Sequence, residues 1–350
     1  MNSYKYLTIC RSPSEQVIGL LEANAIGTPG KSMVYKHARV EEKVKAVPNP
    51  YFANLCIRNR LYGTICLSKR TIFNCGVPRE AFYLRYFTFR ESVRSFDPDS
   101  RKSNKTSPLR DEISALLDGH GLAYSGELLL YAYVDADNVR SERLIKEFGF
   151  HKVGDFQLVP FSRIFTKHHL AVKIADEKIR HRIKEQLHQA HQHQQLVSYE
   201  FLFLHGKYFY IEENNEMVCG VQAIPDTWLV KELPGWMGKI LLRVVPGIPL
   251  LRRLFDPEYQ FVFLEAVFCL PGHESKLSVL FQSALHHFGR HSAVLCVDRR
   301  AKIYSQIKQN NLGLTHKLQG EKTIDIVVKT SRSQSISSDI PFNISGYDVL

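Results

Sequence analysis

A buried strand followed by a short helix that stops at glycine limits the fold of this chain more than any other feature. The apolar run Leu128–Val134 has the length and composition of a strand buried on both faces. The segment Asn138–Phe150 follows it, and four of its residues fall on one helical face: Ser141, Leu144, Ile145 and Phe148. Gly149 stands where a left-handed C-cap is expected, and Phe150 opens a new extended stretch. The pattern predicts a strand–helix–strand unit of an α/β protein.

The same order of elements is predicted twice along the chain. In the first half we expect strands at 4–10, 51–60, 64–73 and 81–94, and a helix starting at Ser107-Pro108, before the unit described above. In the second half we expect a hairpin at 208–225, a strand at 261–270, a helix at 274–288, a strand at 293–297 and a helix at 301–311. Each half therefore has the layout of one mixed α/β sheet.

A chain of 350 residues exceeds what one hydrophobic core usually covers, so two domains are expected. We place the first at 1–165 and the second at 198–330. Apolar residues at helical intervals predict an amphipathic connecting helix within 166–197. The serine-rich end, 331–350, is expected to be a flexible tail.

The spacing of Asn138, Ser141, Leu144 and Gly149-Phe150 resembles the last conserved motif of the GNAT superfamily of acyl-CoA-dependent N-acyltransferases. The resemblance covers nearly all of residues 1–330 and implies a tandem of two GNAT-like domains. It implies an N-acyltransferase that moves an acyl group from acetyl-CoA, or another acyl-CoA, to an amine. One domain would be catalytic and the other structural.

The resemblance also implies a loop at a helix N-terminus that holds the CoA pyrophosphate with backbone N–H groups. In the second half, the family's Pro-x-His-Arg-Gly-Lys run is resembled by Pro271, Gly272, His273, Ser275 and Lys276. Glu274 stands there in place of the usual Arg or Gln.

In the first half, a polar insert replaces that loop. Arg94 and Arg101 could supply positive charge to the phosphates instead, and Asn138 and Ser141 of the terminal motif complete the expected cofactor-binding residues.

Acyl transfer needs a proton acceptor for the amine and a proton donor for the leaving thiolate. In the family the donor is commonly a Tyr one position past the Leu of the terminal motif, and the resemblance places Tyr304 there in the second half. Ile145 occupies that position in the first half. Glu265 and Glu91, both within predicted strands, are the candidate bases. The second half is therefore the favoured catalytic domain.

The net charge of +11 suits an anionic partner such as a phosphorylated cofactor, but no nucleic-acid-binding motif accompanies it. Residues 236–255 combine apolar side chains with cations, which fits an anionic membrane surface, the wall of a tunnel for a long acyl chain, or a lid packed on the core or between the two copies. Without a secretory signal pattern, the expected location is the cytoplasm, with the periphery of the inner membrane as an alternative.

Two features point to no metal and no disulfide framework. Four histidines (His181, His188, His191 and His193) lie in the connecting helix, where we expect them to be solvated. The seven scattered cysteines form no CxxC pair and are expected to be free thiols. Two alternative functions stay open: a non-catalytic scaffold that has lost CoA binding, and a peripheral membrane acyltransferase with a lipid-like substrate.

Overall fold

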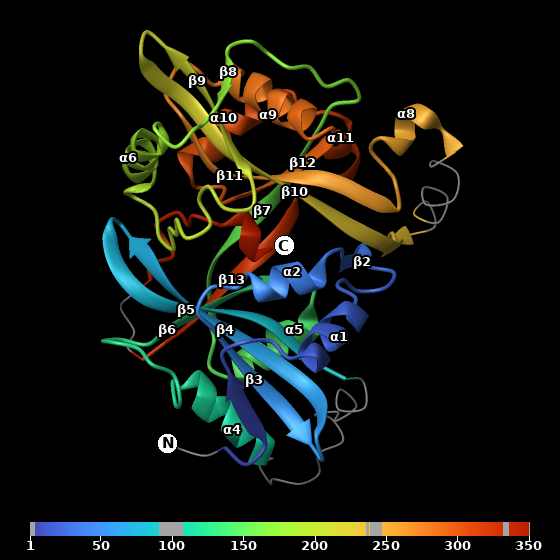
Figure 1. Cartoon of the computed structure of the whole chain (residues 1–350), viewed down its shortest axis with the longest axis vertical. Helices are drawn as coiled ribbons and strands as arrows, with labels where there is room; N and C mark the ends of the chain where they lie inside the picture. The colour runs from blue at the N-terminus through green and yellow to red at the C-terminus, as the bar shows by residue number, and fades with distance from the viewer. Residues whose placement is uncertain (1–3, 91–107, 236–237, 239–246, 332–335, 350) are drawn as a thin grey trace.

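The protein is an elongated α/β molecule whose two lobes share one sheet (Figure 1). A computed structural model describes residues 4–90, 108–235, 238, 247–331 and 336–349. The first half contains β1 (Leu7–Cys10), α1 (Glu15–Ala23), β2 (Val34–His37), α2 (Val40–Lys45), β3 (Pro50–Ile57), β4 (Arg60–Asn74), β5 (Val77–Phe89), α4 (Pro108–Leu117), β6 (Leu129–Asp135), α5 (Val139–Glu147) and β7 (His151–Ser162).

The second half repeats this order with insertions. It contains β8 (Val172–Ile174), α6 (Arg180–His191), β9 (Lys207–Glu213), β10 (Glu216–Glu232), α8 (Pro249–Arg252), β11 (Glu258–Cys269), α9 (Ser275–His287), β12 (Ser292–Val297), α10 (Lys302–Lys308), α11 (Leu314–Gln319), β13 (Lys322–Thr330) and the 3₁₀ turn η3 (Gly346–Asp348). The predicted connecting helix is shorter than 166–197, because β8 pairs with β9 before α6 begins.

The last strand of each half lies in the other half's part of the sheet. The strand order is β1-β3-β4-β5-β6-β13-β7-β12-β11-β10-β9-β8, and β2 pairs with β10 outside this path. Thus β13 pairs with β6, and β7 pairs with β12, each in antiparallel register. The sheet therefore continues without a break across the predicted boundary at residue 165.

Side chains from both halves meet in a central core on one face of the sheet. This core contains Tyr83 and Tyr131 of the first half and Phe261 and Phe263 of the second, together with Phe342 from the end of the chain. The opposite face of the first half is covered by α4 and α5, and that of the second half by α9. The middle of the molecule is thus a single packed region and not a flexible joint.

The segment 336–349 belongs to this core, which corrects the expectation of a flexible tail. Phe342 is 1% exposed and Tyr347 is 4% exposed. Composition misled the prediction, since the serines lie at the start of the segment and the buried apolar residues come after them.

The end of this segment carries a buried ion pair that joins it to the first half. Asp348 accepts from Arg70 Nη1 of β4 at 2.6 Å, and both side chains are almost fully buried. Tyr83 donates its hydroxyl hydrogen to the backbone oxygen of Asp348 at 2.8 Å. The guanidinium also lies over the rings of Tyr83 and Phe201. Because a buried charge is costly without its partner, Arg70 depends on the presence of η3.

Removing the Asp348 carboxylate should therefore destabilise the whole protein. We expect Asp348→Ala to lower the free energy of unfolding by about 3–5 kcal/mol, because Arg70 stays buried without its closest counter-charge. Glu41→Ala, which breaks the exposed Lys45–Glu41 pair, is the control and should cost less than about 1 kcal/mol. Urea denaturation measures both, and equal losses would show that the buried pair is not a determinant of stability.

Candidate active site: two strand divergences

Each half contains one pair of neighbouring parallel strands that separate after a short contact. In the first half, β5 and β6 pair at Phe82–Leu130 and Tyr83–Tyr131. In the second, β11 and β12 pair from Val262–Ala293 to Leu264–Leu295. We call the regions beyond these contacts the first and the second divergence. Among the described residues, no strand pairs with β5 on the β6 side beyond Tyr83.

A β-bulge follows the contact in both halves and bends the strand away. Tyr86 of β5 and Ala266 of β11 have φ values of 55° and 48°, and each stands three residues after a paired residue, Tyr83 or Phe263. The register with the preceding strand slips by one residue at both places, between Thr64 and Cys66 and between Gly220 and Gln222. A bulky tyrosine in left-handed conformation is strained, so the surrounding structure imposes the bend at β5.

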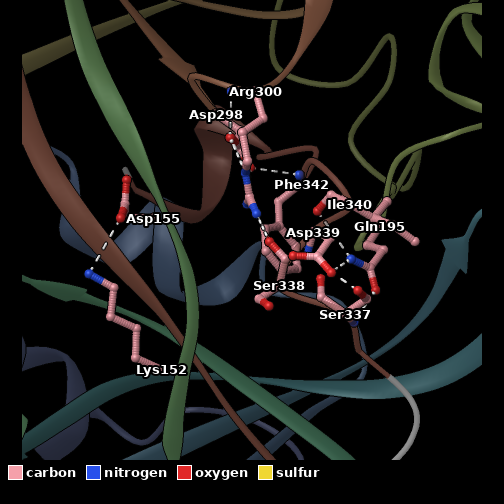
Figure 2. Close-up of polar contacts among 10 residues, drawn as sticks. All are labelled: Lys152, Asp155, Gln195, Asp298, Arg300, Ser337, Ser338, Asp339, Ile340 and Phe342. Atoms are coloured by element: carbon pink, nitrogen blue, oxygen red, sulfur yellow. Dashed lines mark hydrogen bonds and ion pairs between the residues drawn. The ribbon is translucent and has the colours of Figure 1, made fainter.

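The second divergence is filled by the protein's own residues. The C-terminal segment passes there and forms a parallel bridge between Phe342 and Gln195. Figure 2 shows how it is held: the Gln195 amide donates to the backbone oxygens of Ser337 and Ile340 at 2.7 and 3.2 Å. The Phe342 N–H donates to Asp298 Oδ2 at 2.9 Å, at the end of β12.

The clamp around Asp298 includes a bidentate arginine. Arg300 donates from Nε to Asp298 Oδ1 at 3.0 Å and from Nη2 to Oδ2 at 2.5 Å, and its Nη1 donates to the backbone oxygen of Ser338 (Figure 2). Asp298 is 1% exposed. The corresponding Asp135 at the end of β6 is instead paired with Lys322 at 2.5 Å. Only the second of these two aspartates holds the C-terminal segment.

The carbonyl groups along the bent part of β11 are also occupied. His191 Nε2 of α6 donates to the backbone oxygen of Val267 at 3.2 Å, and the Tyr208 hydroxyl donates to that of Ala266 at 3.0 Å. Contrary to the expected solvation, His191 is 4% exposed, because its helix lies against β11. The remaining cavity between these groups measures about 30 Å³, which suits a water molecule and not a nucleotide.

Glu265, the expected base of the second half, holds the C-terminal segment in place. Its Oε1 accepts from Gln222 Nε2 at 2.8 Å, and its Oε2 accepts from the Ser345 hydroxyl at 3.0 Å and from the Tyr347 N–H at 3.3 Å. Burial raises the pKa of Glu265, as a base would require. However, the hydrogen bonds engage both carboxylate oxygens with the protein itself.

Tyr304, the expected proton donor, is not brought to Glu265. Its hydroxyl donates to Glu321 Oε2 at 2.9 Å, within a cluster that also contains Lys308 and His316. The pKa of Tyr304 is raised by burial and by this carboxylate. The neighbouring Ile303 lines the cavity at Glu265 in its place. On α10, the residue beside Glu265 is therefore Ile303 and not Tyr304, so the expected base and the expected proton donor do not meet.

The expected phosphate loop of the second half does not fit a pyrophosphate. Gly272 donates its N–H to Glu274 Oε1 at 3.1 Å. Lys276 pairs with Glu213 at 2.5 Å, and His273 lies 3.5 Å from the same carboxylate. Hydrogen bonds lower the pKa of both Glu213 and Glu274, so two negative charges stand where an anion would bind. Pro271 and Ser275 are exposed beside them.

The first divergence keeps some expected residues and adds others. Glu91, Arg94 and Arg101 lie outside the described residues. Asn138 caps α5 by accepting from the Ser141 N–H at 3.1 Å, which explains the sequence motif as a helix start. Ile145, at the position where a tyrosine is common, is buried in the core beneath the sheet.

The architecture has counterparts among solved structures. No family model and no curated protein matches the chain. Among solved structures, Saccharomyces cerevisiae N-myristoyltransferase with bound myristoyl-CoA superposes with a TM-score of 0.57 at 7% identity, over 99% of this chain and 90% of that one. A second structure of it gives 0.57 at 7% identity, over 96% and 82%. This chain therefore has the mixed α/β fold of that N-myristoyltransferase.

Three tyrosines that the sequence patterns did not single out lie beside the first divergence. Tyr83 of β5 and Tyr131 and Tyr133 of β6 gather on one face at the closed end of the first divergence, with ring centroids 5.1 to 6.0 Å apart. The signal was present, because Tyr131 and Tyr133 are two residues apart and therefore share a face of their strand. Burial raises the pKa of all three phenols, which keeps them protonated at neutral pH.

The expected membrane surface at 236–255 is described only in part, since 236–237 and 239–246 lie outside the described residues. Ile248 and Leu250 are about half exposed. Arg252 pairs with Asp256 at 2.8 Å, and Arg253 donates to the backbone oxygen of Ile164 at 3.1 Å. Both cations are thus engaged within the protein. Within the described residues, every helix is too short or too polar to span a bilayer.

The buried His191 predicts a pH dependence of folding. Its pKa is lowered to about 4, chiefly by burial, against an ordinary value of 6.5. Between pH 6.5 and 4 the unfolded chain binds a proton at this site and the folded chain does not, so stability falls with falling pH. We expect His191→Gln, which keeps a donor for Val267, to remove about 3 kcal/mol of the loss that wild type shows between pH 7 and 4.

The exposed His193→Gln serves as the matched control and should leave the pH profile unchanged. Urea unfolding at each pH gives the profile. If His191→Gln and wild type lose stability in parallel, the histidine is not the buried neutral group described above.

Proposed function

We propose that the protein is an N-acyltransferase that binds acyl-CoA, with acetyl-CoA as the expected donor, at the first divergence. The second half would serve as a structural support and as part of the wall facing the amine acceptor. The observation that carries this proposal is the difference between the two divergences. The second is occupied by the C-terminal segment, His191 and Tyr208, while in the part of the first that the structure describes, no strand pairs with β5 on the β6 side beyond Tyr83.

The edge of β5 that faces β6 suits the amide-containing arm of CoA. Beyond Tyr83, backbone groups along this edge are proposed to exchange hydrogen bonds with a ligand that carries amide groups in an extended chain. Arg94 and Arg101, on the segment that follows β5, are the proposed partners of the phosphates, together with Asn138 and Ser141 at the start of α5. The proposal thus moves the cofactor site from the second half, favoured by sequence, to the first.

The reaction would be direct attack of a neutral amine on the thioester carbonyl. The new C–N bond forms, the C–S bond breaks, and the thiolate leaves with a proton. A backbone N–H of the bent strand β5 is suited to polarise the carbonyl oxygen. Glu91 stays the proposed base. Glu265 and Tyr304 are not proposed as catalytic groups, since their polar atoms are bonded within the protein.

A non-catalytic scaffold is the alternative. The acidic loop at Glu274 and the filled second divergence favour it for the second half taken alone. For the whole protein to be a scaffold, the first half must also fail to bind CoA. A CoA-binding experiment therefore distinguishes the scaffold from the acyltransferase.

Hydrogen exchange with and without acetyl-CoA tests the proposal. At a concentration 100 times its dissociation constant, a ligand that binds only the folded protein stabilises it by about 2.7 kcal/mol. We expect slower amide exchange in peptides that span 84–90 and 132–138, and little change in 266–274. Mass spectrometry of the digested protein reads out each region separately.

Lys276→Ala provides the matched control in the second half. The lysine is already paired with Glu213, so the affinity for acetyl-CoA should stay unchanged. Protection centred on 266–274, with lower affinity in Lys276→Ala, would return the site to the second half. No protection and no thermal shift with any acyl-CoA would favour the scaffold.

A further inference from the structure

The closed end of the first divergence has a shape that bears on which acyl group fits. This inference rests on the proposed function. An acyl-CoA bound along β5 would point its thioester toward the last strand contact, Tyr83–Tyr131. On the side of that contact away from the divergence, the strands are paired at Phe82–Leu130, so an acyl chain cannot continue between them. It has to turn toward one face of the sheet or the other.

The face covered by α4 and α5 is closed by packed apolar side chains. Leu84 and Ala132 lie on this face directly after the strand contact, and they pack with Ile145 and Phe148 of the α5 region. These four residues are between 4% and 8% exposed. A dense core of this kind has no room for added methylene groups without displacement of its side chains.

The opposite face is closed by the aromatic rings described above. The Tyr133 ring lies 5.2 Å from the Tyr83 ring and 5.0 Å from the ring of Phe156 on β7, measured between centroids. Tyr83 is fixed by its hydrogen bond to the Asp348 oxygen, and the Tyr131 hydroxyl accepts from Arg70 at 3.4 Å. The rings therefore cannot move aside independently of the C-terminal turn.

Tyr133 is the outermost member of this group. Tyr83 and Tyr131 are 4% and 1% exposed, whereas Tyr133 is partly exposed and stands two residues past the strand contact on β6. An acyl group turning toward this face meets Tyr133 first. We infer that the protein selects acyl-CoA donors with short acyl groups, and that the Tyr133 ring sets the limit of chain length.

The selection is measured by binding of acetyl-, butyryl-, octanoyl- and myristoyl-CoA to the full chain by calorimetry. We expect wild type to bind the acetyl and butyryl forms at least about tenfold more tightly than the octanoyl and myristoyl forms. Tyr133→Ala should bind octanoyl-CoA at least about tenfold more tightly than wild type does, since two further buried methylene groups already account for such a factor. Its affinity for acetyl-CoA should change by less than about threefold.

Two variants separate size from general damage. Tyr133→Phe keeps the ring and should keep the wild-type preference. Tyr259→Ala removes a partly exposed ring from the same central core, but on β11, and should also keep it. If Tyr133→Ala does not fold, Tyr133→Leu gives a smaller apolar side chain for the same comparison.

The binding results test the proposed function and the chain-length selection separately. Failure of every acyl-CoA to bind would overturn the proposed function itself. Equal binding of short and long donors by wild type would overturn the selection while leaving the acyltransferase proposal in place. Selection that persists unchanged in Tyr133→Ala would show that another residue sets the limit.

Discussion

The buried contact between Arg70 and Asp348 holds the two halves of this molecule in one arrangement. Arg70 comes from β4 in the first half, and Asp348 lies in the 3₁₀ turn that Glu265 of the second half also binds through Ser345 and Tyr347. The turn is therefore fixed from both sides by buried polar groups, Arg70 on one side and Glu265 on the other. Since an uncompensated buried charge costs several kcal/mol, neither half can release the turn without loss of stability. The exchange of β7 and β13 adds backbone hydrogen bonds between the halves to this electrostatic contact.

This arrangement explains why two halves with the same layout do not present the same site. Both have a parallel strand pair, a left-handed bulge two or three residues after the last paired residue, and a helix after each strand. The C-terminal segment exists once, and it can occupy one divergence only. It follows Asp298 and Gln195 through the second divergence, and its final turn ends against the tyrosines at the closed end of the first. The same segment thus fills one site and supports the wall of the other.

Much of the fold could be predicted from local patterns, and the site could not. The strand at Leu129–Asp135, the Asn138 cap and the Gly149 stop are local features, and the structure has all three. The exchange of β7 and β13 depends on pairing between residues at least 130 positions apart, as in Ser162 with Ser292 and Tyr131 with Val328, which no local pattern encodes. The family motif gives the spacing of residues along the chain but not the direction in which each side chain points. It therefore predicted Tyr304 and Glu265 as a catalytic pair. The serine content of 331–350 led to the prediction of a tail, although the same segment also contains Phe342, Tyr347 and Asp348.

The central claim is that the two divergences are unequal and that the first is the ligand site. A crystal structure of the protein with a non-reactive acetyl-CoA analogue tests it most directly. We expect density for the amide-containing arm of the analogue alongside residues 84–89 of β5, with the C-terminal segment still in the second divergence. Density for that arm between β11 and β12, with residues 336–349 displaced, would contradict it.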